Sequence, residues 1–238
     1  MSWREGPVLG LDLETTGTDP MTALPIAFAL VWFGGGEVLK RRYGLIDPGV
    51  EIPAEATAVH GISTAECRER GGALGPSLIG LREQLCEASH DLVPIVACNA
   101  AYDLTVLNQN LWRVHGFDLF WDGWEGPVID PLVLDRHCDT YRKGSRKLSD
   151  LCKHYGVDPG KAHHAGSDAE AATRVAFAIA EKFPEVGDAD LDLLHVLQQG
   201  WHREFITHLS DYYVSQKREP LAAEEGDWPV RGLRGVSL

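Results

Sequence analysis

The stretch that most constrains this chain covers residues 9–17, which read LGLDLETTG. It begins as an apolar run, then carries two carboxylates, Asp12 and Glu14, and ends in a Thr-Thr-Gly turn. Residues i and i+2 of a β-strand point to the same face, so both carboxylates project together from the end of a largely buried strand. Close carboxylates repel each other unless a cation lies between them. A divalent metal site and a solvated acidic turn are therefore the two interpretations of this stretch taken alone.

Hydrophobic patterning predicts a mixed α/β order of elements. Three apolar runs joined by short turns predict an antiparallel meander over residues 8–13, 25–33 and 38–46. Helices and short strands then follow in alternation: a helical turn within 52–63, a short helix capped by Ser63, a helix at 76–88, a strand at 92–98, a helix at 100–115, a strand at 128–130, helices after Pro131 and before Gly156, and a helix capped by Ser167 that ends near Lys182. Loops are short throughout, so residues 1–183 are expected to form one domain.

Residues 184–238 are expected to form a C-terminal helical extension with an irregular tail. Asp188 or Asp190 is the candidate N-cap of a helix with an apolar stripe at helical spacing, namely Leu194, Leu197, Trp201, Phe205, Leu209 and Tyr212. The stripe fits packing on the first domain, and it also fits docking of a partner protein or a second copy. From Arg218 onward the chain is acidic and rich in Gly and Pro, so little regular structure is expected.

Composition limits the classes of protein to which the chain can belong. The formal net charge is -13, which argues against loose electrostatic binding to nucleic acid. No apolar run is long enough to span a membrane, and the N-terminus does not resemble a signal peptide. Five cysteines without a Cys-x-x-Cys pair indicate reduced thiols in a cytoplasmic protein. The densest basic cluster is a candidate phosphate-contacting patch or a solvated loop: Arg142, Lys143, Arg146 and Lys147.

Three further polar residues lie at the ends of predicted elements. Asp103 and Asp168 fall in the first turns of helices, where the helix dipole alone could explain a carboxylate. His163 lies in a loop five residues before Asp168 and could be an ordinary surface histidine. Taken together with Asp12 and Glu14, however, these groups suit two-metal phosphoryl hydrolysis, in which carboxylates hold the ions and a histidine accepts a proton from water.

Three segments resemble the exonuclease motifs of the DEDDh group, the DnaQ-like set that includes the proofreading subunit of the bacterial replicative DNA polymerase. They are residues 12–17, 99–103 and 163–169, and residues 59–63 resemble a segment between the first two motifs. The resemblance covers about residues 8–180. It implies a ribonuclease H-like fold, with a five-stranded mixed sheet and helices on both faces. It also implies 3′→5′ removal of nucleoside monophosphates from a DNA or RNA end.

The resemblance assigns roles position by position. The implied ligands of two divalent ions, Mg²⁺ or Mn²⁺, are Asp12, Glu14, Asp103 and Asp168. His163 is the implied general base, and its neighbour His164 has no assigned role. The groups expected to line the site for the terminal nucleotide are Thr15, Thr16, His60, Gly61 and Asn99. Two departures from many relatives, Cys98 in place of His and Tyr102 in place of Phe, leave the four carboxylates and His163 intact.

The leading hypothesis is a metal-dependent 3′→5′ exonuclease acting on DNA. An exoribonuclease of the same group is the nearest alternative, since the sequence does not reveal how the site treats a 2′-hydroxyl. The expected partner is a single-stranded DNA or RNA 3′ end, with a DNA polymerase or a second copy as candidates for the C-terminal helix. A non-catalytic module that binds nucleic-acid ends or a polymerase is disfavoured, because degenerate copies normally lose metal ligands.

Overall fold

The computed structural model describes residues 2–120, 124, 126–160 and 165–232. Within these residues the strands are β1 (Pro7–Thr15), β2 (Pro25–Gly34), β3 (Glu37–Asp47), β4 (Gly72–Ala73), β5 (Ile95–Val96) and β6 (Val128–Ile129). The α-helices are α1 (Ala54–His60), α2 (Thr64–Arg70), α3 (Leu74–His90), α4 (Ala100–His115), α5 (Pro131–Cys138), α6 (Leu148–Tyr155), α7 (Ala165–Lys182), α8 (Pro184–Gly187) and α9 (Leu191–Ser215). Two short 3₁₀-helices, Trp3–Glu5 and Ala223–Gly226, lie near the two ends.

The strands form one mixed sheet in the order β4-β3-β2-β1-β5-β6. Strands β1, β2 and β3 pair antiparallel, which confirms the predicted meander, and β5 and β6 extend it in parallel from β1. The sequence predicted five strands, whereas the described residues form six. The additional strand, β4, has two residues and pairs with Ile46 and Asp47 of β3. A strand this short leaves no hydrophobic pattern by which it could be predicted.

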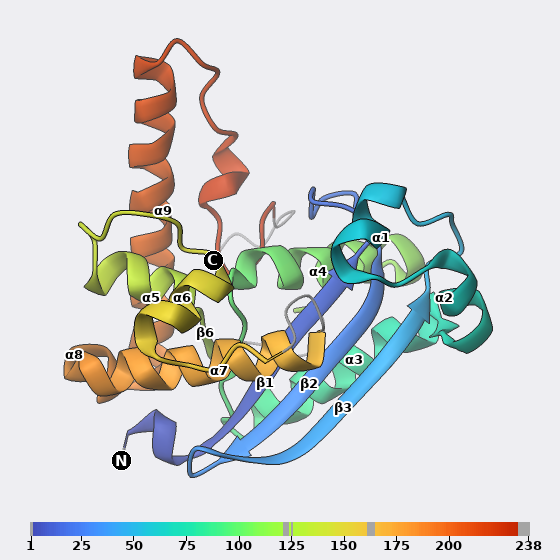
Figure 1. The fold of residues 1–238 in the computed structure, drawn as a ribbon, viewed down its shortest axis with the longest axis horizontal. Coiled ribbons are helices and arrows are strands. Elements are labelled where there is room, and N and C mark those ends of the chain that lie inside the picture. Colours follow the sequence, from blue (N-terminus) through green and yellow to red (C-terminus); the bar gives the residue numbers. More distant parts are fainter. Residues whose placement is uncertain (1, 121–123, 125, 161–164, 233–238) are drawn as a thin grey trace.

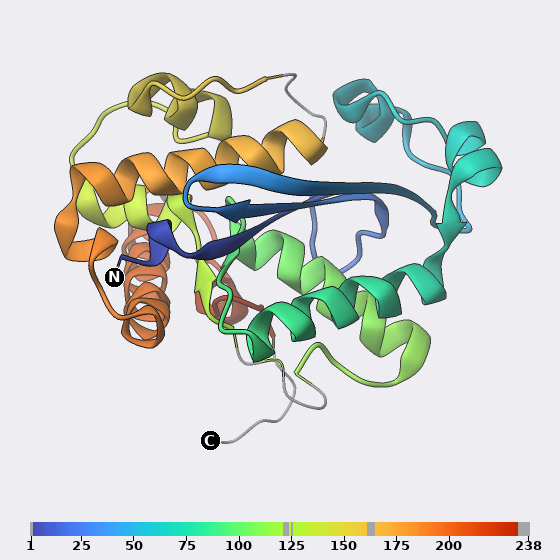
Figure 2. The same cartoon turned by 90° about the horizontal axis from the view of Figure 1, so that it is seen from below.

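Helices cover both faces of the sheet (Figures 1 and 2), so the mixed α/β prediction is confirmed. Figure 2 shows α7 along one face of the long strands and α3 and α4 along the other. Residues Leu9, Leu11 and Leu13 of β1 belong to the core on the α3 and α4 side, whereas Val8 packs with residues of α7. Because side chains alternate along a strand, Gly10, Asp12 and Glu14 share the α7 face with Val8.

Helix α7 approaches the sheet most closely at Gly10. A Cβ atom on Gly10 would lie 2.6 Å from Thr173 Oγ1 and 2.9 Å from the Ala169 carbonyl oxygen. Distances below 3.0 Å to a backbone atom require the two elements to separate, so a glycine is needed at this crossing. The contact brings the first turn of α7 against the strand that carries Asp12.

Two helix starts show where cap prediction succeeds and where it does not. The Ser63 side chain accepts the Glu66 N–H at the start of α2, as the capping-box pattern predicted. The prediction that Ser167 caps the next long helix is wrong, because α7 already begins at Ala165 and Ser167 lies within its first turn. Alanine has a high helix propensity, which is consistent with this earlier start.

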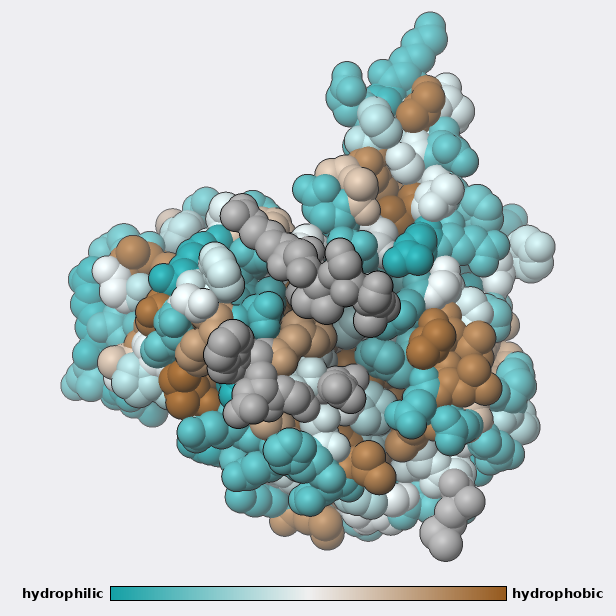
Figure 3. All heavy atoms as spheres, turned by 180° about the vertical axis from the view of Figure 1, so that it is seen from behind, coloured by the Kyte–Doolittle hydropathy of each residue, from teal (hydrophilic) through white to brown (hydrophobic). Residues whose placement is uncertain are grey.

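The C-terminal helix α9 divides into a packed half and a projecting half. Asp190 caps it by accepting the Asp192 and Leu193 N–H groups. Leu194 is buried and Phe205 is half-buried beneath the Arg136 guanidinium, whereas Tyr212 is 58% exposed, so the packing of the apolar stripe is lost toward the end of the helix. The outer half and the returning chain stand away from the body in Figure 1, and this arm mixes hydrophobic and hydrophilic surface in Figure 3. No helix in the described part of the chain is both long and apolar enough to cross a membrane.

The tail beyond Arg218 has little regular structure, as expected, but it is packed into the body. Trp228 and Val230 are 5% and 1% exposed and belong to the core on the α3 and α4 side. The Arg231 N–H donates to Thr105 Oγ1 of α4 at 2.9 Å. Composition favoured an irregular segment correctly, but it gave no sign that two apolar residues anchor that segment.

The basic cluster after α5 is not a free phosphate-binding patch. Arg142 and Arg146 both pair with the fully buried carboxylate of Asp135, to which the Tyr155 hydroxyl also donates at 2.8 Å. Arg142 contributes the longer of these two ion pairs, at 2.7 Å. Both arginines therefore neutralise an internal charge and fold the loop before α6, and only the exposed Lys143 and Lys147 remain turned to solvent.

Removing the anchor of the tail should destabilise the whole protein. We expect Trp228→Ala to lower the free energy of unfolding by about 3–5 kcal/mol, because a large buried side chain is lost. Tyr141→Ala is the matched control, since Tyr141 is 94% exposed and its removal should change stability by less than about 0.5 kcal/mol. Urea unfolding of both variants tests the prediction, and equal stabilities would contradict the packing of the tail.

Candidate active site

Three of the predicted carboxylates converge at the end of β1. Oxygen atoms of Asp12, Glu14 and Asp168 lie within 4.8 Å of one another, close enough to share a metal ion. Asp12 and Glu14 come from one face of the strand, and Asp168 comes from the first turn of α7. The close contact of α7 with Gly10, two residues before Asp12, is what places Asp168 beside them.

Asp103 approaches from α4, on the other side of the sheet, and is not a member of that 4.8 Å group. Pairing between β1 and β5 is limited to Leu9 with Ile95 and Gly10 with Val96, so the edge of β1 is open farther along. At this open edge the Leu13 N–H donates to Asp103 Oδ1 at 3.0 Å. Since Leu13 lies between Asp12 and Glu14, this hydrogen bond holds the fourth carboxylate next to the other three.

The turn that follows the acidic pair is held by hydroxyl groups. Thr15 Oγ1 donates to the Gly17 carbonyl at 2.8 Å, and the Tyr102 hydroxyl contacts both Thr15 Oγ1 and that carbonyl. The Leu24 N–H donates to Thr16 Oγ1 at 3.0 Å. Tyr102, the departure noted in the sequence, thus attaches the first turn of α4 to the end of β1 with a hydroxyl that a phenylalanine lacks.

Burial and mutual repulsion raise the pKa values of Asp12, Glu14 and Asp103. Burial raises the pKa of Asp12 well above its usual range, and Asp103, Glu14 and Asp168 raise it further. Burial and Asp168 raise the pKa of Glu14 to about 7. Burial also raises the pKa of Asp103 to about 8, although the Leu13 N–H opposes the shift. Each shift means that negative charge is disfavoured at this position.

A cation is what this cluster needs. In the described part of the chain, Asp12, Glu14 and Asp103 form no ion pair with Lys, Arg or His. Several carboxylate oxygens in a small volume are the ligand set that Mg²⁺ and Mn²⁺ prefer. The residues present therefore fit divalent metal ions.

Asp130 is a buried carboxylate to which the sequence analysis gave no role. It follows β6, is 1% exposed, and accepts the N–H groups of Asn99 and Ala100 at 3.0 and 2.9 Å. It thereby fixes the start of the helix that carries Asp103. The only signal in the sequence was its position between a short strand and Pro131, and that position also fits its observed role as the N-cap of α5.

The residues expected to line the nucleotide site lie in three loops. Asn99 has a left-handed backbone, with φ 66° and ψ 47°, directly before α4. His60 ends α1 and accepts the Ile62 N–H at Nδ1, and Gly61 follows with φ 77°. His163, the predicted general base, and its neighbour His164 lie outside the described residues. Burial and the neighbouring carboxylates of Asp130, Asp12 and Asp103 raise the pKa of Cys98, which favours the protonated thiol.

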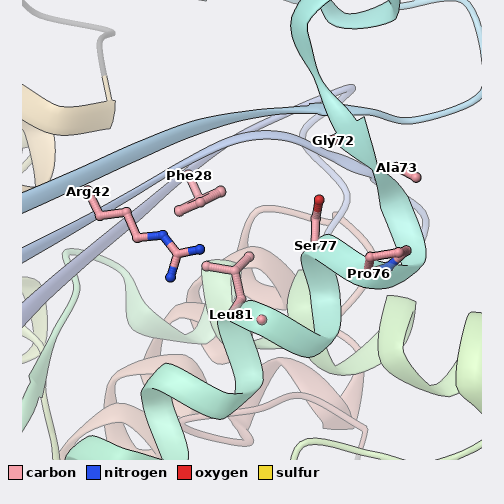
Figure 4. Close-up of a pocket in the computed structure, with 8 residues that line it drawn as sticks. Phe28, Arg42, Gly72, Ala73, Pro76, Ser77 and Leu81 are labelled. Atoms are coloured by element: carbon pink, nitrogen blue, oxygen red, sulfur yellow. The ribbon is translucent and has the colours of Figure 1, made fainter.

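A separate cavity of about 210 Å³ lies between β3, β4 and α3. Figure 4 shows the Arg42 guanidinium extending beneath Phe28 toward Leu81, with Ser77 on the helix beside it. None of the described residues that line this cavity is Asp, Glu, His or Cys. It therefore lacks the chemistry of the carboxylate cluster.

The fold and the carboxylate cluster together define a class of nucleic-acid enzymes, and comparison with known proteins identifies the family. The exonuclease family RNase_T matches residues 9–176, and the chain belongs to this family. The predicted DnaQ-like exonuclease family is confirmed.

Two relatives show the range of proteins in which similar chains occur. The PolC-type DNA polymerase III of Thermotoga maritima is 29% identical over 79% of this chain and 13% of its own length. The 3′-5′ exonuclease DinG of Bacillus subtilis is 28% identical over 87% of this chain and 21% of its own length. The chain thus spans about a fifth or less of these relatives.

A solved structure confirms the fold. The crystal structure of E. coli Exonuclease I in complex with a dT13 oligonucleotide matches with a TM-score of 0.64 and 22% identity, over 77% of this chain and 43% of that one. The ribonuclease H-like fold with helices on both faces of the sheet, which the sequence resemblance implied, is therefore present together with the C-terminal helices.

The raised pKa values predict how stability depends on pH without metal. A carboxylate whose pKa rises on folding contributes stability below its unfolded value, and this contribution is lost as pH rises through its folded value. The pKa of Glu14 rises from 4.5 to about 7 and that of Asp103 from 3.8 to about 8, so metal-free protein should become less stable between pH 3.8 and about 8. Thermal melting in EDTA tests this. The decline should shrink in Asp12→Asn/Glu14→Gln, and an unchanged decline would contradict the assigned source.

Proposed function

We propose that this chain is a metal-dependent 3′→5′ exonuclease that releases nucleoside monophosphates from the 3′ ends of single-stranded DNA. The observation that carries the proposal is the convergence of Asp12, Glu14 and Asp168 at one end of the sheet, with Asp103 fixed beside them. The family match supports nuclease chemistry. DinG is described as a 3′-5′ exonuclease and Exonuclease I was solved with a dT13 oligonucleotide, which supports the direction and the substrate.

The four carboxylates would hold two divalent ions, Mg²⁺ or Mn²⁺. When bound, such ions activate the attacking water and stabilise negative charge on the attacking and leaving oxygens. The protein's own part is to keep the carboxylates close together and oriented. The Leu13 N–H orients Asp103, and the contact of α7 with Gly10 orients Asp168. Glu14 must be deprotonated to act as a ligand, so metal affinity should increase as pH rises past about 7.

The remaining groups would handle the proton and the nucleotide. His163 is proposed as the general base, on the strength of the five-residue offset to Asp168 that the family pattern shares. A histidine near its ordinary pKa can take a proton from water at neutral pH. Asn99, His60 and Gly61, with the backbone around Thr15 and Thr16, would surround the terminal nucleotide. Thr15 ends β1, His60 ends α1, and Asn99 directly precedes α4, so these residues lie at the ends of helices and strands.

We also propose an exonuclease domain over residues 1–183, an extension over 184–238, and a DNA polymerase as a candidate partner. The polymerase partner is supported by the PolC-type relative, which matches over 79% of this chain. The formal net charge of -13 disfavours tight binding to long duplexes, so a frayed or single-stranded end is the expected substrate.

Loss of one central ligand should abolish hydrolysis. Asp12→Ala should lower turnover of 5′-labelled single-stranded DNA by more than about 10²-fold, since charge stabilisation in the site is lost. Glu69→Ala, which removes an exposed carboxylate of α2, is the control and should leave turnover unchanged. Turnover of Asp12→Ala within tenfold of wild type would contradict the metal-site assignment. Duplex DNA and RNA of equal length complete the assay, and faster loss of RNA would favour an exoribonuclease.

The adjacent histidines allow a sharp test of the general base. His163→Ala should reduce turnover by about 10²–10⁴-fold while Mn²⁺ still raises the melting temperature, because carboxylates rather than histidine hold the ions. His164→Ala should leave both properties near wild type. If His164→Ala is the damaging change and His163→Ala is mild, the assignment of the third motif is wrong by one residue.

A further inference from the structure

The outer edge of β6 is covered by polar side chains of α9 instead of another strand. β6 is the last strand of the sheet, and its inner edge pairs with β5. On the outer edge, the Val128 N–H donates to His195 Nδ1 at 3.1 Å, and the Val128 carbonyl accepts from Gln198 Nε2 at 2.9 Å. Exposed strand edges are usually protected in some way, and here a helix supplies the missing donors and acceptors.

Gln198 also reaches beyond the strand. Its Oε1 atom accepts the Asp130 N–H at 2.8 Å, and its side chain is completely buried. One side-chain amide therefore binds the backbone at two points, the Val128 carbonyl and the Asp130 N–H. The tail adds a weaker contact from the same side, since Trp228 Nε1 lies 3.4 Å from Asp130 Oδ2. Both contacts come from the segment that follows residue 183.

Asp130 connects these contacts of Gln198 to the carboxylate cluster through its own hydrogen bonds. Its two oxygens accept the N–H groups of Asn99 and Ala100, where the chain takes a left-handed conformation that non-glycine residues adopt only with support. Asp103 lies in the first turn of the helix that starts there, and it accepts the Leu13 N–H between the two acidic residues of β1. A continuous series of hydrogen bonds and short backbone segments thus connects α9 to the site.

We propose that Gln198 is a positioning residue for the exonuclease reaction: through Asp130 it sets the backbone of residues 99–103 and thereby the placement of Asp103. This inference rests on the proposed function. It makes the C-terminal extension part of the support of the active site, in addition to any role in docking. Side chains that do not touch the metal but hold its ligands in place through hydrogen bonds typically contribute about 10–100-fold to metal affinity or activity.

The variant that tests this is Gln198→Met, which keeps the length and volume of the side chain but can neither donate nor accept these hydrogen bonds. We expect turnover of single-stranded DNA with Mn²⁺ to fall about 10–100-fold and the half-saturating Mn²⁺ concentration to rise. Amide hydrogen exchange in the segment 97–103 should become faster by about tenfold or more, a readout that needs no activity.

Two controls separate positioning from general stability. Gln199→Met makes the same substitution at the next residue, whose amide nitrogen lies 3.3 Å from His195 Nε2, and it should leave all three readouts near wild type. Leu194→Ala removes a buried side chain one turn earlier on α9, so it should lower the melting temperature without changing the half-saturating Mn²⁺ concentration.

The results distinguish the positioning role of Gln198 from the proposed exonuclease function. Unchanged exchange over 97–103 in an active Gln198→Met variant would overturn the positioning role and leave the proposed function standing. Equal effects of Gln198→Met and Leu194→Ala on turnover and on metal saturation would also overturn it, because both would then act only through stability. A wild-type protein that hydrolyses no DNA or RNA end would instead overturn the proposed function itself.

Discussion

The structure depends on holding several like charges close together in one place. Asp12, Glu14 and Asp168 lie within 4.8 Å of one another, and the described residues provide Asp12 and Glu14 with no ion-pair partner. Removing charged groups from water is costly, and the raised pKa values of Glu14 and Asp103 record that cost. A fold keeps such a cluster only where the rest of the structure outweighs the repulsion, and divalent ions are the natural means of relieving it.

The supporting structure comes from all parts of the chain. The contact of α7 with Gly10 sets Asp168, the open edge of β1 gives Asp103 its hydrogen bond, and Tyr102 holds the turn after Glu14. Behind these lie the buried Asp130 and the amide of Gln198, which extend the support into the C-terminal segment. The site is therefore the meeting point of elements that are distant in sequence, and each is positioned by packing on the same sheet.

The sequence predicted the parts of the fold that are governed by local pattern. The meander, the helix over 100–115 and the cap at Ser63 follow from periodicity and turn residues, and the structure confirms them. The two-residue strand β4, the buried Trp228 and the ion pairs of Arg142 and Arg146 with Asp135 depend on contacts between distant segments, which local patterns do not encode. For the same reason the carboxylates were identified by motif, whereas Asp130 and Gln198, which act through backbone contacts, were not.

Direct observation of the metal ions tests the central claim most sharply. Crystals soaked in Mn²⁺ and measured for anomalous scattering should show two peaks about 3.5–4 Å apart, in contact with Asp12, Glu14, Asp103 and Asp168. The same experiment on Asp12→Ala serves as the control and should lose at least one peak. Mn²⁺ peaks elsewhere, or none beside these four residues at saturating metal, would contradict the account of the carboxylate cluster as a two-metal catalytic site.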